Sequence, residues 1–312
     1  MAAPREGFGA RWFWYALLTV VGWAAWALLL KLGSLEIPDQ PALFLQTLGM
    51  LPLVPLLVAR GKLRGPQDRR GVIYSLLNGA ITGIGILFLL AAYRKGGNTG
   101  VVSVSTALYP LVTCALALVL LRERLAGRQW LGLALSIAAI VLFAWPASAV
   151  TSAADSALAA APGAAGALAT PRDVGLADSW LLYTLLALVC FGIVGFLQKV
   201  STDRISAESA LVWLIVGFVL LLPFIYTGPA TFHYPARSIL YVVAGGLLNA
   251  LGSWALLAAM KHGGKASIVV PMTAVYPMLV CLVAPLLLHE ILTLVQGIGI
   301  ALGLGAILLL AS

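Results

Sequence analysis

The chain has 312 residues, of which 62% are hydrophobic and 10% are charged. A soluble domain carries about 25% charged residues, and a chain of this length has no interior that could hide so much apolar surface, so the composition excludes a soluble protein. The net charge of +8 is explained by the basic loops of a membrane protein, and we expect no nucleic acid among its partners.

Ten apolar segments are long enough to cross a bilayer, because a hydrocarbon core of about 30 Å takes about 20 helical residues. The first segment is expected to be retained, since the short stretch before it lacks a signal-peptide cleavage pattern. The composition and these segments predict an all-α integral membrane protein. In chain order the predicted transmembrane helices are 12–30, 41–59, 71–93, 100–121, 127–145, 179–200, 207–227, 238–260, 266–288 and 291–311.

Lysine and arginine gather in every second loop between these spans. The segments 60–70 and 122–128 are the most basic, and Lys199, Arg204 and Lys261 lie on the same side of the predicted membrane. Because loops rich in lysine and arginine stay in the cytoplasm, the N- and C-termini are both predicted to be cytoplasmic. We expect the protein in a bacterial inner membrane.

The sequence contains one pattern twice. Residues 94–110 (RKGGNTGVVSVSTALYP) align with 261–277 (KHGGKASIVVPMTAVYP) at a shift of 167, which keeps paired glycines, a valine, Thr-Ala and Tyr-Pro in register. The chain is therefore predicted to be two copies of a five-helix unit. The same shift, or a shift of 168 nearer the start of each unit, relates further pairs: Gly85 and Gly252, Cys114 and Cys281, Glu123 and Glu290, Lys31 and Lys199, and Gly49 and Gly217.

The two predicted repeats are residues 1–145 and 179–312. Between them the segment 146–178 is rich in Ala, Gly, Ser and Pro, which predicts a flexible external linker. A unit with an odd number of helices leaves the chain on the opposite side of the membrane, so the two repeats are predicted to be inverted around a central cavity. Inverted repeats are typical of alternating-access transporters, which hold the substrate near the midplane between the repeats.

Two segments resemble a known family: LYPLVTCALALVLLRERL (108–125) and its second copy VYPMLVCLVAPLLLHEIL (275–292). They are similar to the EamA-type branch of the drug/metabolite transporter superfamily, and the resemblance covers nearly all of the chain outside the linker. That family usually has glycine before the acidic residue of this turn, whereas this chain has Arg122 and His289. The resemblance implies a ten-helix transporter of small metabolites, often an exporter, whose cavity is lined by the first, third, fourth, sixth, eighth and ninth helices.

Two prolines are predicted to interrupt transmembrane helices at matched places. Pro110 and Pro277 lack an N–H, so the carbonyls four residues earlier, at Thr106 and Thr273, lose their helical donors. In hydrocarbon such a carbonyl must meet protein, water or substrate. These positions are therefore candidates for a cavity lining or a hinge, with a packing kink as the alternative. Three more residues belong to this candidate site: Tyr109, Tyr276 and Pro271.

The third and eighth spans carry matched polar pairs. Asn78 and Thr82 are four residues apart, as are Asn249 and Ser253, so each pair lies on one helix face. They are candidates for orienting a polar substrate, and the alternative is hydrogen bonding between helices. Four tryptophans within spans could form an aromatic wall of the cavity or pack in the core: Trp23, Trp26, Trp213 and Trp254.

Several chemistries have no residues to support them. All eleven acidic residues lie at helix ends or in loops, so an ion or proton site at mid-membrane is not predicted. The three cysteines lie in spans without CxxC spacing, and no zinc or hydrolase motif is present, so neither a metal, a cofactor nor an enzyme is predicted.

The predicted function is export or exchange of a neutral or zwitterionic metabolite, such as an amino acid. The alternatives are a channel-like facilitator and a transporter of cationic drugs or organic anions, and the partners are a small-molecule substrate and membrane lipids, in a monomer or a homodimer.

Overall fold

The computed structural model describes residues 10–34, 36–59, 63, 67–94, 106, 108–144, 180–225, 233–276, 278–280, 282–283 and 294–311. The predicted linker, most of residues 100–108 and Pro277 lie outside these described residues. Every regular element within them is a helix, which confirms the all-helical prediction. The helices are α1 (Arg11–Ser34), α2 (Asp39–Met50), α3 (Leu53–Ala59), α4 (Arg69–Arg94), α6 (Tyr109–Leu120), α7 (Gly127–Ala144), α9 (Trp180–Thr202), α10 (Ala207–Val219), α11 (Leu222–Ile225), α12 (Ala236–Lys261), α13 (Ala266–Thr273) and α15 (Leu294–Ala311).

Six segments of the described chain are long and apolar enough to cross a membrane, which supports an integral membrane protein. They are Arg11–Leu30, Gln40–Ala59, Arg69–Leu89, Trp180–Thr202, Ala207–Phe224 and Ala236–Lys261. Shorter apolar helices lie within the other four predicted spans. Two of the predicted spans are not single helices. The span 41–59 is divided into α2 and α3 beside Pro52, and the span 207–227 into α10 and α11 beside Pro223, because proline cannot continue the hydrogen-bond ladder of a helix.

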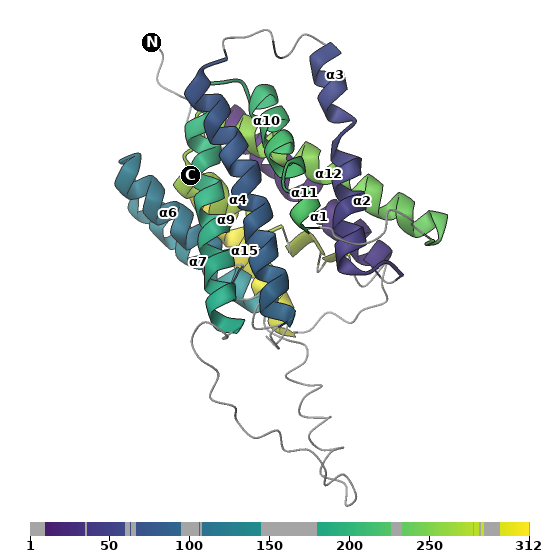
Figure 1. Ribbon diagram of the computed structural model, residues 1–312. Coiled ribbons are helices and arrows are strands. Elements are labelled where there is room, and N and C mark those ends of the chain that lie inside the picture. Colours follow the sequence, from purple (N-terminus) through teal and green to yellow (C-terminus); the bar gives the residue numbers. More distant parts are fainter. Residues whose placement is uncertain are drawn as a thin grey trace, which may run out of the picture.

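Helices from the two parts of the chain pack against each other. The most extensive contacts pair α1 with α12 and α4 with α9, and Figure 1 shows α4 and α9 running alongside each other. A second set pairs α2 with α12 and α10 with α4, and α7 packs on α15. Each of these pairs joins a helix before the predicted linker to a helix after it. The core of the protein therefore lies between the two halves.

Glycine allows two of these helix pairs to approach until backbone meets backbone. A Cβ atom on Gly246 of α12 would lie 2.0 Å from the carbonyl oxygen of Gln46 in α2. A Cβ atom on Gly79 of α4 would lie 2.1 Å from the carbonyl oxygen of Leu214 in α10. No side chain fits at such a distance, so these positions require glycine.

The two close contacts occupy equivalent places in the two copies of the sequence pattern. Gly79 and Gly246 are related by the shift of 167, and Gln46 and Leu214 by the shift of 168. A second such set joins Gly49 to the Val243 carbonyl and Gly217 to the Leu76 carbonyl, at 2.0 and 2.2 Å from the Cβ position of each glycine. The packing of one half on the other thus repeats itself.

Two ion pairs lie at opposite ends of the bundle. At one end Arg237 donates to Glu36 (2.6 Å), and the Ser238 hydroxyl donates to the same carboxylate, which together hold the pKa of Glu36 below its usual value. At the other end Arg204 donates to Asp68 (2.9 Å) and, with the Arg70 N–H, holds the pKa of Asp68 below its usual value. Each pair links a residue of the first half to a residue of the second.

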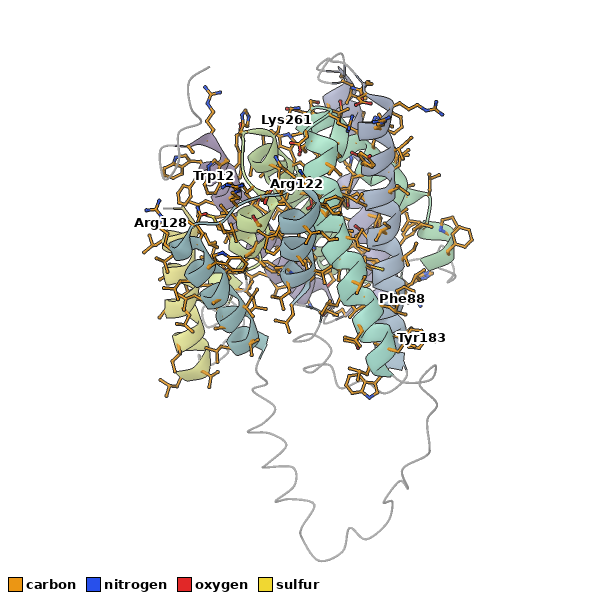
Figure 2. All side chains as sticks on the ribbon, turned by 90° about the vertical axis from the view of Figure 1, so that its left-hand side faces the viewer. Trp12, Phe88, Arg122, Arg128, Tyr183 and Lys261 are labelled. Atoms are coloured by element: carbon orange, nitrogen blue, oxygen red, sulfur yellow. The ribbon has the colours of Figure 1, made fainter. Side chains whose placement is uncertain are left out.

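Basic residues gather at the end that holds Asp68, which is also the end where α12 finishes. Figure 2 shows Arg122, Arg128 and Lys261 toward this end, and Phe88 and Tyr183 toward the opposite end. The beginning of α1 and the end of α15 also meet here, since Phe13 and Leu310 belong to one buried cluster. We call the two ends the Glu123 end and the Glu36 end, after one glutamate at each.

The turn after α6 contains the departure from the family pattern. Arg122 has φ of 53°, and no other non-glycine residue of the described chain has a positive φ. A left-handed residue commonly ends a helix, and this position usually belongs to glycine because a side chain costs about 1–2 kcal/mol there. The family pattern of glycine before the acidic residue therefore has a backbone explanation at this turn.

Replacing Arg122 with glycine is expected to keep the fold and to raise its stability by up to about 1 kcal/mol, because the strain of the left-handed residue is relieved. The measurement is thermal unfolding in detergent micelles. Arg124→Gly is the matched control, since it removes the same charge from the same turn without relieving a positive φ. A loss of stability in Arg122→Gly as large as that in Arg124→Gly would contradict the explanation.

Candidate functional site

The helix α13 is short and contains a proline. All eight of its residues are buried, and it ends at Thr273, where a turn over residues 274–276 leads to Tyr276. Pro271 lies inside this helix and leaves the Ser267 carbonyl without its helical donor. The thiol of Cys114 in α6 donates to that carbonyl at 3.5 Å. The helix continues through Pro271 to Thr273, and Cys114 of another helix satisfies the carbonyl that Pro271 frees.

The polar groups of Thr273 are all used within its own segment. Its hydroxyl donates to the carbonyls of Val269 (2.9 Å) and Val270 (3.1 Å). Its carbonyl accepts the N–H of Tyr276 at 3.1 Å. The sequence predicted that this carbonyl would need a partner because of Pro277. The turn supplies that partner, so neither the hydroxyl proton nor the carbonyl of Thr273 is unpaired.

The matched segment around Pro110 is arranged differently. The described helix α6 begins at Tyr109, so Pro110 lies in its first turn, where the missing N–H would have no helical partner in any case. Thr106 is buried, and Leu108 accepts the N–H of Leu111 at 3.0 Å. Since residues 100–105 and 107 lie outside the described chain, the predicted break in a longer helix stays a prediction.

Aromatic side chains converge where these segments meet α1. The Tyr276 ring lies edge-on to Trp23, with 5.9 Å between ring centroids, and is tilted 6.3 Å from Trp26. Tyr109 packs against the same buried cluster as Trp23. We call Trp23, Trp26, Tyr109 and Tyr276 the aromatic cluster.

The two tryptophans of the cluster differ in their hydrogen bonding. The indole N–H of Trp26 donates to the side-chain oxygen of Gln46 at 2.8 Å. The indole nitrogen of Trp23 is buried and has no partner among the described residues. The Trp23 ring lies directly on Gly252 of α12, where a Cβ atom would be 2.6 Å from the ring. A buried donor without an acceptor is rare, so the Trp23 N–H is available to a ligand.

The predicted polar pair on α12 lies beside the aromatic cluster. Gly245 faces Trp26 and Gly252 faces Trp23, and Asn249 lies between them on the same helical face. Asn249 is half-buried and Ser253 is buried. Trp254 lies elsewhere: its ring packs edge-on to Tyr15 at 5.8 Å, and its buried indole nitrogen has no partner among the described residues.

The predicted pair on α4 lies deeper in the protein. Asn78 is 1% exposed, and its side-chain nitrogen has no partner in the described part of the chain. The Thr82 hydroxyl donates to the Asn78 carbonyl at 2.8 Å, so this hydroxyl is used within α4. Asn78 therefore presents an unpaired donor, whereas Thr82 does not.

Of the four tryptophans that the sequence offered as a possible aromatic wall, the structure brings Trp23 and Trp26 to Tyr276. Trp23 and Trp26 lie three residues apart and so share one face of α1. Trp213 does not join them, since its indole donates to Gln67 at the Glu123 end (3.4 Å). Within the described residues no group of His, Cys, Asp and Glu side chains could hold a metal ion.

Comparison with known proteins identifies the family. The profile of the EamA-like transporter family matches residues 10–145 and again residues 178–312, which together make up most of the chain. The chain belongs to the EamA-like transporter family. The resemblance seen in the two Tyr-Pro segments is thereby confirmed. EamA-like proteins are transporters, which agrees with the absence of enzyme motifs in the sequence.

Two relatives describe how far the likeness extends. An uncharacterized protein of Methanocaldococcus jannaschii is 31% identical over 134 residues, which are 43% of this chain and 97% of that protein. That relative is therefore about as long as one of the two EamA-matched segments. A solved crystal structure with 20% sequence identity has a TM-score of 0.68 and covers 96% of this chain and 95% of its own. At that identity the likeness shows the fold alone.

Proposed function

We propose that this EamA-like protein moves a small neutral or zwitterionic metabolite, such as an amino acid, across the membrane by alternating access, as an exporter or exchanger. The observation that carries the proposal is the aromatic cluster with the unpaired indole N–H of Trp23. It lies between helices of both halves, next to the turn that follows α13. Aromatic faces accommodate apolar groups, and a buried donor fixes one acceptor of a ligand.

The lack of charge at this place selects the substrate class. All acidic residues of the sequence lie at helix ends or in loops, and the basic residues of the described chain lie near helix ends. A substrate with a large net charge would be left without a counter-charge in a medium of low dielectric constant. A neutral or zwitterionic molecule avoids this cost because its charges compensate each other. Indole, amide and tyrosine groups then suffice to orient it.

The proposed architecture is ten transmembrane helices in two inverted five-helix repeats. The matched glycine contacts support the repeat, because they join equivalent positions twice. The direction of the helices supports the inversion. The first helix of the first repeat, α1, begins at the Glu123 end. The first helix of the second repeat, α9, finishes at this end, because its Lys199 donates to the Met260 carbonyl near the end of α12 (3.4 Å). The proposed repeats are residues 1–145 and 179–312, with 146–178 as the linker.

The proposed orientation follows from the basic residues. They gather at the Glu123 end, and the positive-inside rule assigns that end to the cytoplasm. Because the start of α1 and the end of α15 lie at this end, both termini are proposed to be cytoplasmic, in a bacterial inner membrane. The Glu36 end then faces outward.

Counterflow in proteoliposomes tests the proposed function. The purified protein is reconstituted and preloaded in turn with amino acids, sugars, organic anions and quaternary amines, and uptake of the matching labelled compound is followed. Transient, saturable accumulation of an amino acid or another neutral compound is expected, and Tyr109→Ala or Asn249→Ala should weaken it. Unsaturable passage of ions, with no counterflow of any compound, would instead indicate a channel.

A further inference from the structure

The turn between α6 and α7 is fastened to the beginning of α13. One carboxylate oxygen of Glu123 accepts the N–H of Ala266 (3.0 Å), and the other accepts the N–H of Ser267 (3.0 Å) together with its hydroxyl. The first N–H groups of a helix have no partners inside it, and a negative charge at that terminus is favourable. Glu123 thus caps a helix of the other half of the protein.

A second contact joins the same two segments, again with the donor on the side of α13 and the acceptor in the turn after α6. Lys265 occupies the N-cap position of α13, where its side chain makes no capping hydrogen bond. Its ammonium group donates instead to the Arg124 carbonyl at 2.8 Å. The 121–126 turn therefore accepts hydrogen bonds from the first residues of α13 and from the residue before them.

The helix α13 is short and lies between two non-helical segments. Gly263, with φ of 97°, and Gly264 precede it, and the 274–276 turn follows it. Residues that absorb large changes in φ and ψ are what hinges require. After the C-terminal end of α13, the 274–276 turn connects the helix to Tyr276 of the aromatic cluster. A movement of α13 would therefore connect the Glu123 end with the candidate substrate site.

Cys114 contacts the first turn of α13, whose N–H groups donate to Glu123. Its side chain is 3% exposed, and its thiol donates to the carbonyl of Ser267, the residue that Glu123 holds. A displacement of α13 from the turn would break this contact and open the thiol to reagents. The reactivity of Cys114 should thus show whether the contact between Glu123 and α13 is formed or broken.

We infer that Glu123 is a positioning residue for transport: its contact with Ala266 and Ser267 closes the Glu123 end, and its release lets α13 move and open the path to the aromatic cluster. This inference rests on the alternating-access function proposed above. Discontinuous helices form the substrate sites of many transporters, at the interface between the repeats that move during alternating access.

The carboxylate of Glu36 is the matched control. It also connects the first half to a helix start in the second half, through Arg237 and Ser238 at the beginning of α12. However, α12 packs extensively on α1, so we expect this helix not to move by itself. Glu36→Gln makes the same chemical change at the opposite end of the bundle.

The experiment measures how fast Cys114 reacts with a maleimide. Cys190 and Cys281 are replaced with alanine, and the labelling rate is followed in detergent and in vesicles for the parent, Glu123→Gln, Ser267→Ala and Glu36→Gln. The amide of Glu123→Gln turns a donor toward one of the two N–H groups. The rate should therefore rise at least about tenfold, because bonds to a charged acceptor are roughly twice as strong as neutral ones. Ser267→Ala removes one donor, so a rise of about two- to tenfold is expected.

Two results would overturn the inference. One is a labelling rate in Glu123→Gln equal to that of the parent, and the other is an equal acceleration in Glu36→Gln, which would indicate general loosening. If Glu123→Gln fails to fold, Ser267→Ala carries the test alone. Labelling as expected without transport of any compound would remove the proposed function and leave the contact as a conformational latch. Saturable transport with unchanged labelling in Glu123→Gln would remove the latch alone.

Discussion

Alanine in place of Gly246 is expected to destabilise the protein by about 2 kcal/mol or more, since overpacking of a rigid core costs about 1–3 kcal/mol and no side chain can move aside here. The new methyl group would lie 2.0 Å from the Gln46 carbonyl oxygen, so α2 and α12 would have to separate. The loss would be visible as a lower thermal midpoint in detergent. Gly79→Ala, at the equivalent contact with Leu214, should have a similar effect.

Gly297→Ala provides the control for this prediction. Gly297 lies in α15, and no atom of the described residues is within 4 Å of its Cβ position. Alanine is a better helix former than glycine by about 1 kcal/mol, so stability should stay equal or increase. Equal midpoints for Gly246→Ala and Gly297→Ala would contradict the close packing of α2 on α12.

The largest functional effect is expected at Trp23. Phenylalanine at this position keeps the aromatic ring and removes the unpaired N–H. If that N–H binds the substrate, the KM for transport should rise about tenfold to a hundredfold, the effect of losing one hydrogen bond to a charged or strongly polar acceptor. Stability should change by less than about 1 kcal/mol, because no protein partner loses a hydrogen bond. Initial rates of counterflow over a range of substrate concentrations give the KM.

Trp26→Phe separates binding from structure. Its N–H donates to the side-chain oxygen of Gln46, so this change leaves a buried acceptor unpaired. A loss of stability of about 1–3 kcal/mol is expected, with a smaller effect on KM than in Trp23→Phe. An unchanged KM in Trp23→Phe would show that the indole N–H takes no part in substrate binding.

Some of the fold could be predicted from local sequence and some could not. The long apolar runs that became α1, α4, α9 and α12 were predictable, because the hydrophobic length alone determines a membrane helix. The division of the second span at Pro52 was predictable in principle, since proline ends a helix, but apolar residues on both sides masked it.

The candidate site was less predictable, because it depends on contacts between distant segments. The Tyr-Pro repeat predicted a break at Pro277, which lies outside the described residues, and the bond from the Tyr276 N–H to the Thr273 carbonyl belongs to the turn and has no sequence signature. The position of Trp23 on Gly252 requires the packing of α1 on α12. For the same reason the partner of Glu123 could not be read from the acidic turn itself.

The packing of α1 on α12 also has a consequence for biosynthesis. Residues 35–235 separate the two helices in the chain, so α1 enters the membrane long before its main partner has been synthesised. Until then the lipid must solvate the face that Gly252 and its neighbours later cover. Insertion and assembly are therefore distinct stages for this protein, and the final helix contacts form only once the second half has been inserted.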